Sequence, residues 1–242
     1  MSKLRLGVVF GGRSVEHEVS VVSAMELLAH ADPERFEPAP FGVTRDGRWL
    51  TPQETAHQLG RDEPLFTKRL QADVPPLAQR PEILRDLAQC DAIFPLVHGV
   101  NGEDGTLQGM FEVLGLPYAG CGVAASAIGM DKVLQKELFV RAGLEVAPFF
   151  FATKHQWAEI PKQIVQSVEQ SFKYPVFVKP ANGGSSVGVS KVRSREDLGD
   201  AMSAAFRIDR KVLVEAAVHG REVECGVLGN DDPEASPIGE IV

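Results

Sequence analysis

The 242-residue chain is long enough for one large domain or two smaller ones, and its 44% hydrophobic and 24% charged residues are ordinary for a globular protein with a buried core. Its formal net charge is −8 and its basic residues are scattered, which disfavours a nucleic-acid partner. The sequence has no apolar run near the ~20 residues of a membrane span and no secretory signal, so we expect no membrane partner and a cytoplasmic location.

In the first half, apolar runs alternate with helical patterns. Three of the runs predict buried strands, at residues 4–10, 36–43 and 91–97. Gly11-Gly12 predicts a turn after the first strand, and Asp46-Gly47 predicts a hairpin turn after the second. Leu107 to Leu114 repeat at helical spacing, and Gly115 closes that helix. Strands alternating with helices predict an α/β domain with a mainly parallel sheet, whose functional loops gather at the carboxyl ends of the strands.

The remainder of this half carries weaker signals. Residues 53–85 are polar and rich in proline, so we assign them to loops and an irregular helix. Residues 116–121 predict a short strand, followed by small residues up to Gly129. We expect a domain boundary near Met130.

After Met130 the pattern predicts an α+β domain. Helices are expected at residues 131–141, ended by Gly143 in the left-handed conformation, and at 155–171. A third helix begins at the capping-box pattern Ser194-x-x-Asp197. Strands are expected at residues 146–152, 212–215 and 222–228.

The stretch FVKPANGGSSVGVSKV, residues 177–192, predicts a strand that leads into a phosphate-holding loop. Lys179 lies at the end of the strand, where an ammonium can reach a bound anion. Glycines permit close backbone approach and positive φ, and Ser185 and Ser186 add hydroxyl donors. The pattern is not a Walker A loop, because the lysine precedes the glycines. The competing interpretation is a surface hairpin loop without function.

Several charged residues of this half are spaced so that one nucleotide can touch them all. Lys132 and Lys179 can neutralise phosphate charge, and backbone groups beside Val218 can bond an adenine edge. Glu222, seven residues after Glu215, can accept ribose hydroxyls. The sequence therefore predicts ATP as a ligand.

The three cysteines, Cys90, Cys121 and Cys225, are widely spaced and odd in number, which disfavours a disulfide framework. They match no zinc pattern, and we assign no residue of the chain to a metal. We expect all three to be small buried hydrophobes.

Five segments in order, VFGGRSVEHEVSV, LVHGVNGEDGTLQG, MDK, FVKPANGGSSVGVSKV and GREVECGVLGN, resemble the D-alanine–D-alanine ligase family of the ATP-grasp superfamily. The resemblance covers essentially the whole chain. It implies an N-terminal α/β domain at residues 1–130, an α+β ATP-grasp domain at 131–228, and the start of a C-terminal catalytic domain at 229–242.

The resemblance also implies roles for individual residues. Glu16 is the expected anchor for the ammonium of the first D-alanine, with His98 beside that substrate, and Ser185 helps to hold the closed site, so Glu16 and Ser185 are the expected catalytic residues. Each has a plain structural alternative, such as a first-turn carboxylate for Glu16. We assign Lys136 and Glu224 to the surface charges. The expected ATP-binding residues are Lys132, Lys179, Ser185, Ser186, Glu215, Ala217, Val218 and Glu222.

The implied reaction joins two D-alanines through an acyl phosphate, with ATP and Mg²⁺, for peptidoglycan precursors. The family's Mg²⁺ ligands, substrate-binding arginine and active-site loop are expected beyond residue 242. We therefore expect these 242 residues alone to be a fragment that binds nucleotide weakly and does not ligate. The family also implies a homodimer through the N-terminal domain.

Three alternatives stay open at this point. One is a D-alanine–D-lactate ligase on the same scaffold, and another is a nucleotide-binding module without catalysis. A third treats Gly7-x-x-x-Gly11-Gly12 as a dinucleotide-binding turn, which the missing G-x-G-x-x-G pattern disfavours.

Overall fold

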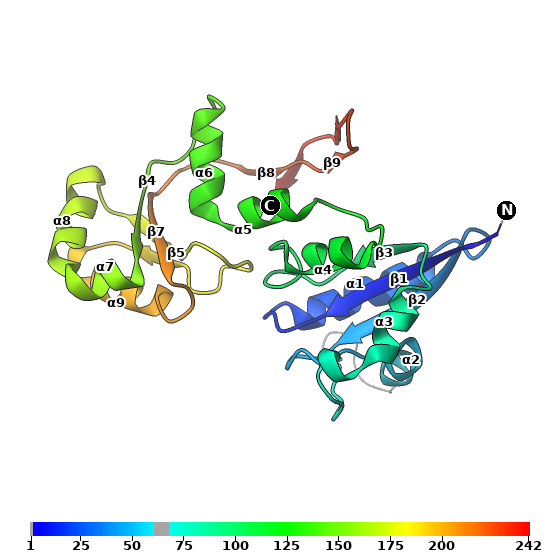
Figure 1. The fold of residues 1–242 in the computed structure, drawn as a ribbon. Coiled ribbons are helices and arrows are strands. Elements are labelled where there is room, and N and C mark those ends of the chain that lie inside the picture. Colours follow the sequence, from blue (N-terminus) through cyan, green and yellow to red (C-terminus); the bar gives the residue numbers. More distant parts are fainter. Residues whose placement is uncertain (1, 61–67) are drawn as a thin grey trace.

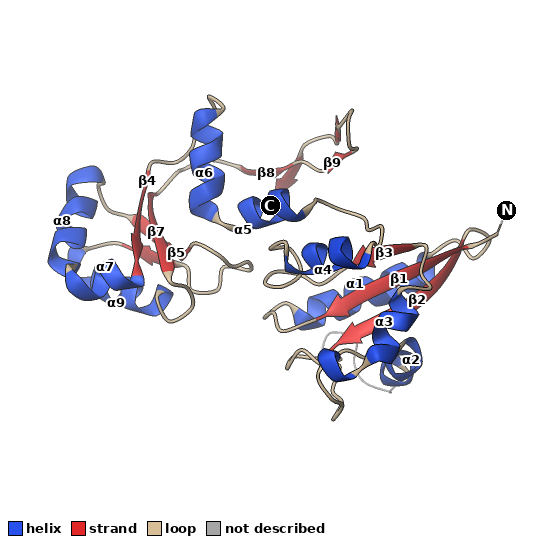
Figure 2. Cartoon of the chain, in the orientation of Figure 1, coloured by secondary structure: helices blue, strands red, loops and turns tan. Residues whose placement is uncertain are grey.

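The structure is a computed structural model that describes residues 2–60 and 68–242 (Figure 1). A first lobe contains β1 (Leu4–Gly11), α1 (His17–His30), β2 (Phe36–Val43), α2 (Pro52–Leu59), the 3-10 helix η2 (Leu77–Gln79), α3 (Pro81–Leu87), β3 (Ala92–Pro95) and α4 (Thr106–Leu114). Between the lobes lie α5 (Val123–Met130) and α6 (Lys132–Arg141). The second lobe contains β4 (Phe149–Thr153), α7 (Lys154–Glu159), α8 (Pro161–Ser171), β5 (Val176–Pro180), β6 (Ser190–Val192), α9 (Arg195–Ala205) and β7 (Lys211–Ala216). The short strands β8 (Glu222–Glu224), β9 (Val227–Leu228), β10 (Glu234–Ala235) and β11 (Gly239–Ile241) follow (Figure 2).

The first lobe is built on a parallel sheet in the order β2-β1-β3. Successive residues of β1 enter different cores, with Val9 packed on one face and Val8 on the other. A parallel sheet covered on both faces requires such a continuous apolar strand. The Asp46-Gly47 turn is also present, since Val43 bridges Trp49 across it. The predicted α/β domain is therefore confirmed.

Residues 53–85 correct the prediction, because they contain helices α2 and α3. α2 starts with a capping box, in which Thr51 and Glu54 each accept the other's backbone N–H, at 3.2 and 2.8 Å. α3 starts with Pro81, where the missing N–H costs no helical hydrogen bond. The capping box and Pro81 can both be recognised in the sequence. They determine where the two helices start, in spite of the polar composition of the region. Residues 61–67 of this region lie outside the described residues.

The segment between α4 and α6 also differs from the prediction. The strand expected at residues 116–121 consists of a parallel bridge between Ile93 and Tyr118. The small residues up to Gly129 form α5. The expected boundary near Met130 falls where α5 ends and α6 begins. The division into residues 1–130, 131–228 and 229–242 stays a prediction.

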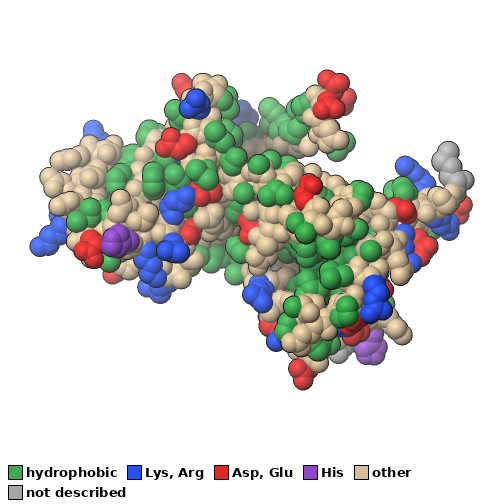
Figure 3. Space-filling view, viewed as in Figure 1, with side chains coloured by type: hydrophobic (Ala, Val, Ile, Leu, Met, Phe, Trp, Pro, Cys, Tyr) green, Lys and Arg blue, Asp and Glu red, His purple; other side chains and the backbone are tan. Residues whose placement is uncertain are grey.

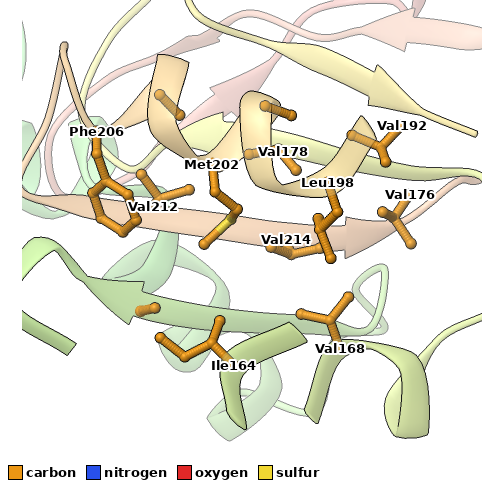
Figure 4. Packing of buried hydrophobic residues seen from close by; sticks show 13 residues of the cluster. Ile164, Val168, Val176, Val178, Val192, Leu198, Met202, Phe206, Val212 and Val214 are labelled. Atoms are coloured by element: carbon orange, nitrogen blue, oxygen red, sulfur yellow. The ribbon is translucent and has the colours of Figure 1, made fainter. Parts of the chain in front are cut away.

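The second lobe is built on a sheet in the order β4-β7-β5-β6, with antiparallel neighbours. Alternate residues of its central strands pack with α8 and α9 in one buried cluster (Figure 4). These are Val176, Val178, Val212 and Val214. Because side chains alternate along a strand, Lys179 and Glu215 lie on the other face, where Val133 of α6 packs against Leu213. The predicted α+β arrangement is confirmed, and it leaves charged side chains on the face toward α6.

Three details of this lobe correct the prediction. The helix expected at residues 155–171 is split into α7 and α8, because Pro161 begins a new helix. Ser194 Oγ donates to Asp197 Oδ2 at 3.2 Å, instead of accepting a backbone N–H as a capping box requires. The strand expected at 222–228 is interrupted between β8 and β9.

The cysteines differ in exposure. Cys90 is buried, as expected, and its thiol pKa is raised by burial. Cys121 and Cys225 are exposed, so the expectation of three buried cysteines is wrong for these two.

The surface shown in Figure 3 carries acidic and basic side chains interspersed over both lobes. None of the helices in the described ranges is both long and apolar enough to span a membrane.

Candidate active site

Two lysines share the carboxylate of Glu215 on the face of the second sheet that α6 covers. Lys179 pairs with Oε1, and the Lys136 ammonium lies 3.0 Å from Oε2. Strand register places Glu215 between Phe149 and Phe177. The Lys136 ammonium lies 5.6 Å from the ring centroid of Phe149, and that of Lys179 lies 5.5 Å from the centroid of Phe177. Cations and rings therefore surround a carboxylate whose side chain is only 11% exposed.

The balance of these contacts keeps Glu215 ionised. Burial is the largest influence and acts to raise the pKa of Glu215, but the hydrogen bonds from Lys179 and Lys136 outweigh it and lower the pKa. The assignment of Lys136 to the surface charges is wrong, because its side chain is 15% exposed and bound to Glu215.

Lys132 connects α6 to the loop after β5. It follows the helix N-cap Asp131, whose carboxylate accepts two N–H groups of the first turn. The Lys132 ammonium donates to the carbonyl of Gly183 at 2.6 Å. Burial, and after it the charge of Lys179, lowers the pKa of Lys132. The N-terminus of α6 and the loop therefore fix each other's position.

The loop itself turns through positive φ at Gly183, Ser185, Ser186 and Gly188. Packing around Gly188 is tight as well, because an added Cβ would lie 2.3 Å from Ile208 Cδ1 and 2.9 Å from Pro180 Cγ in its rigid ring. Ser185 and Ser186 are exposed at the tip.

A cavity of about 180 Å³ lies against this loop. Its lining brings together the ammonium-bearing Lys132 and Lys179 with Ser185 and Ser186. Two cations and two hydroxyl groups around such a volume suit a phosphate group. We call it the phosphate cavity.

In the first lobe, a buried histidine anchors the loop between β1 and α1. His17 Nδ1 lies 2.8 Å from the carbonyl of Gly12, and its Nε2 accepts the N–H of Leu70 at 3.2 Å. These contacts require a neutral ring with its proton on Nδ1, and burial lowers the pKa of His17 accordingly. His17 thereby positions the neighbouring Glu16.

Glu16 lies where the loops of the two lobes meet. A Cβ added to Gly99 would lie 3.1 Å from Glu16 Oε2, and one added to Gly184 would lie 3.0 Å from the same atom. Figure 1 shows the loop between β5 and β6 directed toward the first lobe. Because residues 99 and 184 are both glycine, the loops that carry them can lie this close to the Glu16 carboxylate.

His98 follows β3 and faces the same region. Its Nδ1 lies 3.6 Å from Glu103 Oε1, while Glu103 Oε2 accepts the N–H of Gly99 at 2.8 Å. The interaction with Glu103 raises the pKa of His98, although burial opposes it, and the charge of Glu16 adds to the effect. Glu103 thus holds both His98 and its loop.

A cleft of about 600 Å³ lies between the loops after β3, helices α5 and α6, and Gly183-Gly184 of the second lobe. We call it the interlobe cleft. Two of the described residues that line it, His98 and Gln108, each carry a buried side-chain atom without a hydrogen-bond partner, Nε2 and Oε1 respectively. The interlobe cleft and the phosphate cavity share three lining residues, which are Lys132, Gly183 and Gly184. A molecule in the cleft would therefore lie beside a group in the phosphate cavity.

Four predicted nucleotide residues line neither cavity. Among the described residues that line the two cavities, Glu215, Ala217, Val218 and Glu222 are absent. Ala217 is half-buried, Val218 is 70% exposed, and Glu222 is exposed on β8 opposite Ile241. Ala217 and Val218 directly follow β7, the strand that carries Glu215, whereas Glu222 lies on a separate two-stranded sheet.

Two family models match this chain. "D-ala D-ala ligase N-terminus" matches residues 5–121, and "D-ala D-ala ligase C-terminus" matches residues 138–242. The chain is 45% identical over 246 residues to the D-alanine–D-alanine ligase of Geobacillus thermodenitrificans, an alignment that covers 99% of this chain and 68% of that protein. The chain belongs to the D-alanine–D-alanine ligase family. The resemblance read from its motifs is thereby confirmed.

Other relatives agree with the D-alanine–D-alanine ligase assignment. The ligase of Bacillus licheniformis is 46% identical over 251 residues, covering 99% of this chain and 68% of the relative. Among solved structures, the VanG D-Ala:D-Ser ligase of Enterococcus faecalis superposes with a TM-score of 0.79 at 33% identity, covering 99% of this chain and 70% of that one. The D-alanine-D-alanine ligase of Coxiella burnetii gives 0.76 at 30% identity, covering 100% and 69%. The ATP-grasp fold expected from the resemblance is confirmed.

A family member is expected to use Mg²⁺. In residues 2–60 and 68–242, no group of three or more His, Cys, Asp or Glu side chains is placed to hold a metal ion.

Sequence reasoning missed two residues of this site, Lys136 and Glu103. A signal for Lys136 was its spacing of four from Lys132, which places both on one side of α6. Glu103 lacked a comparable signal, because its contact with His98 depends on how the loop folds.

Proposed function

We propose that this protein acts in the ATP-dependent joining of two D-alanines for peptidoglycan precursor synthesis, in the cytoplasm. The supporting observation is the wall of Lys132, Gly183 and Gly184 shared by the interlobe cleft and the phosphate cavity. An amino acid in the cleft would lie beside the terminal phosphate of a nucleotide, which is the arrangement phosphoryl transfer to a carboxylate needs.

In this proposal the two lobes bind different substrates. Glu16 binds the ammonium of the first D-alanine and His98 lies beside it. Lys132 and Lys179 bind the ATP phosphates with Ser185 and Ser186. Glu215, Ala217 and Val218 contact the adenine, and Glu222 binds the ribose. Mg²⁺ belongs to the proposal as a partner of ATP, without a ligand assigned among the described residues.

The chemistry has two steps. A carboxylate oxygen of the first D-alanine attacks the γ-phosphorus, and ADP leaves as the bond to its bridging oxygen breaks. The amine nitrogen of the second D-alanine then attacks the acyl carbon and loses a proton, and inorganic phosphate leaves. The ammonium groups of Lys132 and Lys179 neutralise charge that develops on the transferred group.

D-Alanine is our choice as second substrate, because relatives 40% to 46% identical carry that name. The structural neighbour named as a D-Ala:D-Ser ligase, and the D-lactate alternative, make the second substrate a matter for direct measurement. Mass spectrometry of products from D-alanine supplied with D-serine or D-lactate distinguishes the three.

Nucleotide binding is the first test. Equilibrium dialysis of the 242-residue chain against ATP is expected to detect binding, and Lys179→Ala should weaken it about tenfold or more. Lys162→Ala, which removes an exposed lysine from α8, is the matched control. Unchanged affinity in Lys179→Ala would contradict the phosphate role and favour a module without this chemistry.

Two further parts of the proposal have their own assays. We expect these 242 residues alone to release no phosphate with D-alanine and Mg-ATP, and dipeptide formation by the purified chain would contradict this. We also propose a homodimer through the first lobe, and a monomer in light scattering would argue against it.

A further inference from the structure

The two lysines on Glu215 are not equivalent. Lys179 lines the phosphate cavity, and among the described residues that line it Lys136 is absent. The Lys136 ammonium is held instead by Glu215 Oε2 at 3.0 Å, by the carbonyl of Ala147 at 3.4 Å and over the ring of Phe149. A bound phosphate can therefore attract Lys179, while Lys136 stays on Glu215.

This difference matters because Glu215 is nearly buried, with a side chain that is 11% exposed. Once Lys179 turns toward a phosphate, its hold on Glu215 Oε1 weakens. A buried carboxylate that loses its cations is costly, so a carboxylate with Lys179 as sole partner would retain that lysine and oppose phosphate binding. A second cation on the other oxygen removes this competition.

We propose that Lys136 is a positioning residue of the nucleotide site, which keeps Glu215 charged and oriented while Lys179 binds phosphate. The inference rests on the proposed nucleotide-binding function. Lys136 does not touch the phosphate in this arrangement, and it acts through Glu215.

The proposal predicts a selective loss. Without Lys136, Glu215 and phosphate compete for Lys179, so ligands with phosphates lose affinity. Adenosine carries no phosphate, so Lys179 stays on Glu215 and continues to hold the carboxylate for its contact with the adenine even without Lys136. Lys136→Met should therefore weaken ATP about tenfold and adenosine less than about threefold.

The test is equilibrium dialysis of ATP and adenosine against the 242-residue chain and its variants. Lys136→Arg restores the positive charge and should bring the ATP affinity to within about threefold of the unsubstituted chain. Glu215→Gln removes the charge that Lys136 compensates, so adding Lys136→Met to it should change ATP affinity by less than about twofold. Lys162→Met is the control for removal of an exposed lysine and should change neither ligand.

Failure of the proposed nucleotide site and failure of the Lys136 role give different results. If the unsubstituted chain binds neither ATP nor adenosine at millimolar concentration, the proposed nucleotide site is refuted, and this inference with it. If that chain binds ATP but Lys136→Met weakens both ligands equally, or weakens ATP equally in the Glu215→Gln background, the role of Lys136 is overturned alone. Circular dichroism checks the fold of each variant. Should Lys136→Met not fold, Lys136→Gln and the double variant carry the same comparison.

Discussion

Glu16 and Gly184 come from different lobes, and a Cβ added to Gly184 would lie 3.0 Å from Glu16 Oε2. Glu16 is the proposed anchor for the substrate ammonium, so a methyl group at residue 184 should displace it. Gly184→Ala is expected to weaken D-alanine binding at least about threefold in saturation-transfer NMR. Stability should change little, because the displaced atoms end a flexible side chain.

Gly109 gives a matched control for that variant. It lies in α4 outside the lining of the interlobe cleft, and an added Cβ there meets none of the described atoms within 4 Å. Gly109→Ala should bind D-alanine normally. Equal D-alanine affinity in Gly184→Ala and in the unsubstituted chain would argue against Glu16 as the ammonium site.

Gly188 and Gly199 predict opposite responses to the same substitution. Gly188 has φ of +74° and an added Cβ 2.3 Å from Ile208 Cδ1, so Gly188→Ala should lower the free energy of unfolding by about 1–3 kcal/mol. Gly199 lies within α9 with open space around it, so Gly199→Ala should raise that free energy by about 0.5–1 kcal/mol. Urea denaturation measures both, and a neutral Gly188→Ala would contradict the packing described for the loop.

Glu103→Gln should lower the pKa of His98, because the Glu103 interaction is the main cause of its elevation. A His pKa raised in the folded state adds stability below the unfolded value of about 6.5, and that stability is lost as pH rises through the folded value. The variant should therefore lose stability mainly at acidic pH. NMR titration of the His98 ring and urea denaturation at about pH 5.5 and 8.5 test this.

Glu137→Gln, exposed on α6, is the control for that titration and should leave His98 unchanged. An unaltered His98 pKa in Glu103→Gln would show that Glu103 does not hold the ring.

Arg80 is a structural cation of the first lobe. Its side chain is 7% exposed and bonds Glu54 twice at 2.9 Å, Glu82 at 2.7 Å and the carbonyl of Trp49 at 2.7 Å. Arg80→Met leaves the buried carbonyl contact unmade and removes the cation between two partly exposed carboxylates, so it should cost about 1–3 kcal/mol of unfolding free energy. Arg85→Met, exposed on α3, should stay within about 0.5 kcal/mol. A cost for Arg80→Met as small as that of Arg85→Met would contradict the account.

The fold was predictable from the sequence in the elements where burial gives the apolar residues a regular spacing. The strand that begins at Leu4 is an apolar run because both of its faces are buried. The strand that begins at Val176 is recognisable because its alternate residues are buried. α5 was missed because its small residues show no amphipathic period, and α2 was missed because its capping box lies in a polar region. Composition is a weaker guide than capping chemistry at such places.

The site was predictable where a residue belongs to a motif. Lys132, Lys179, Ser185 and Ser186 meet at one cavity, as a phosphate-holding loop requires. Lys136 was not assigned to the site, because its spacing from Lys132 shows only that both lie on one side of α6, and its position against Glu215 depends on how α6 crosses the sheet. Such a crossing is set by packing between Val133 and Leu213, which no local pattern records.

Lys132 lines both the interlobe cleft and the phosphate cavity, so its positive charge acts on ligands in both. A charged ligand that interacts with Lys132 in one cavity therefore changes the affinity of the other cavity for its ligand, even without a change in the backbone. Thermodynamic linkage makes this effect reciprocal. If bound nucleotide raises the affinity for the amino acid by some factor, bound amino acid raises the affinity for the nucleotide by the same factor.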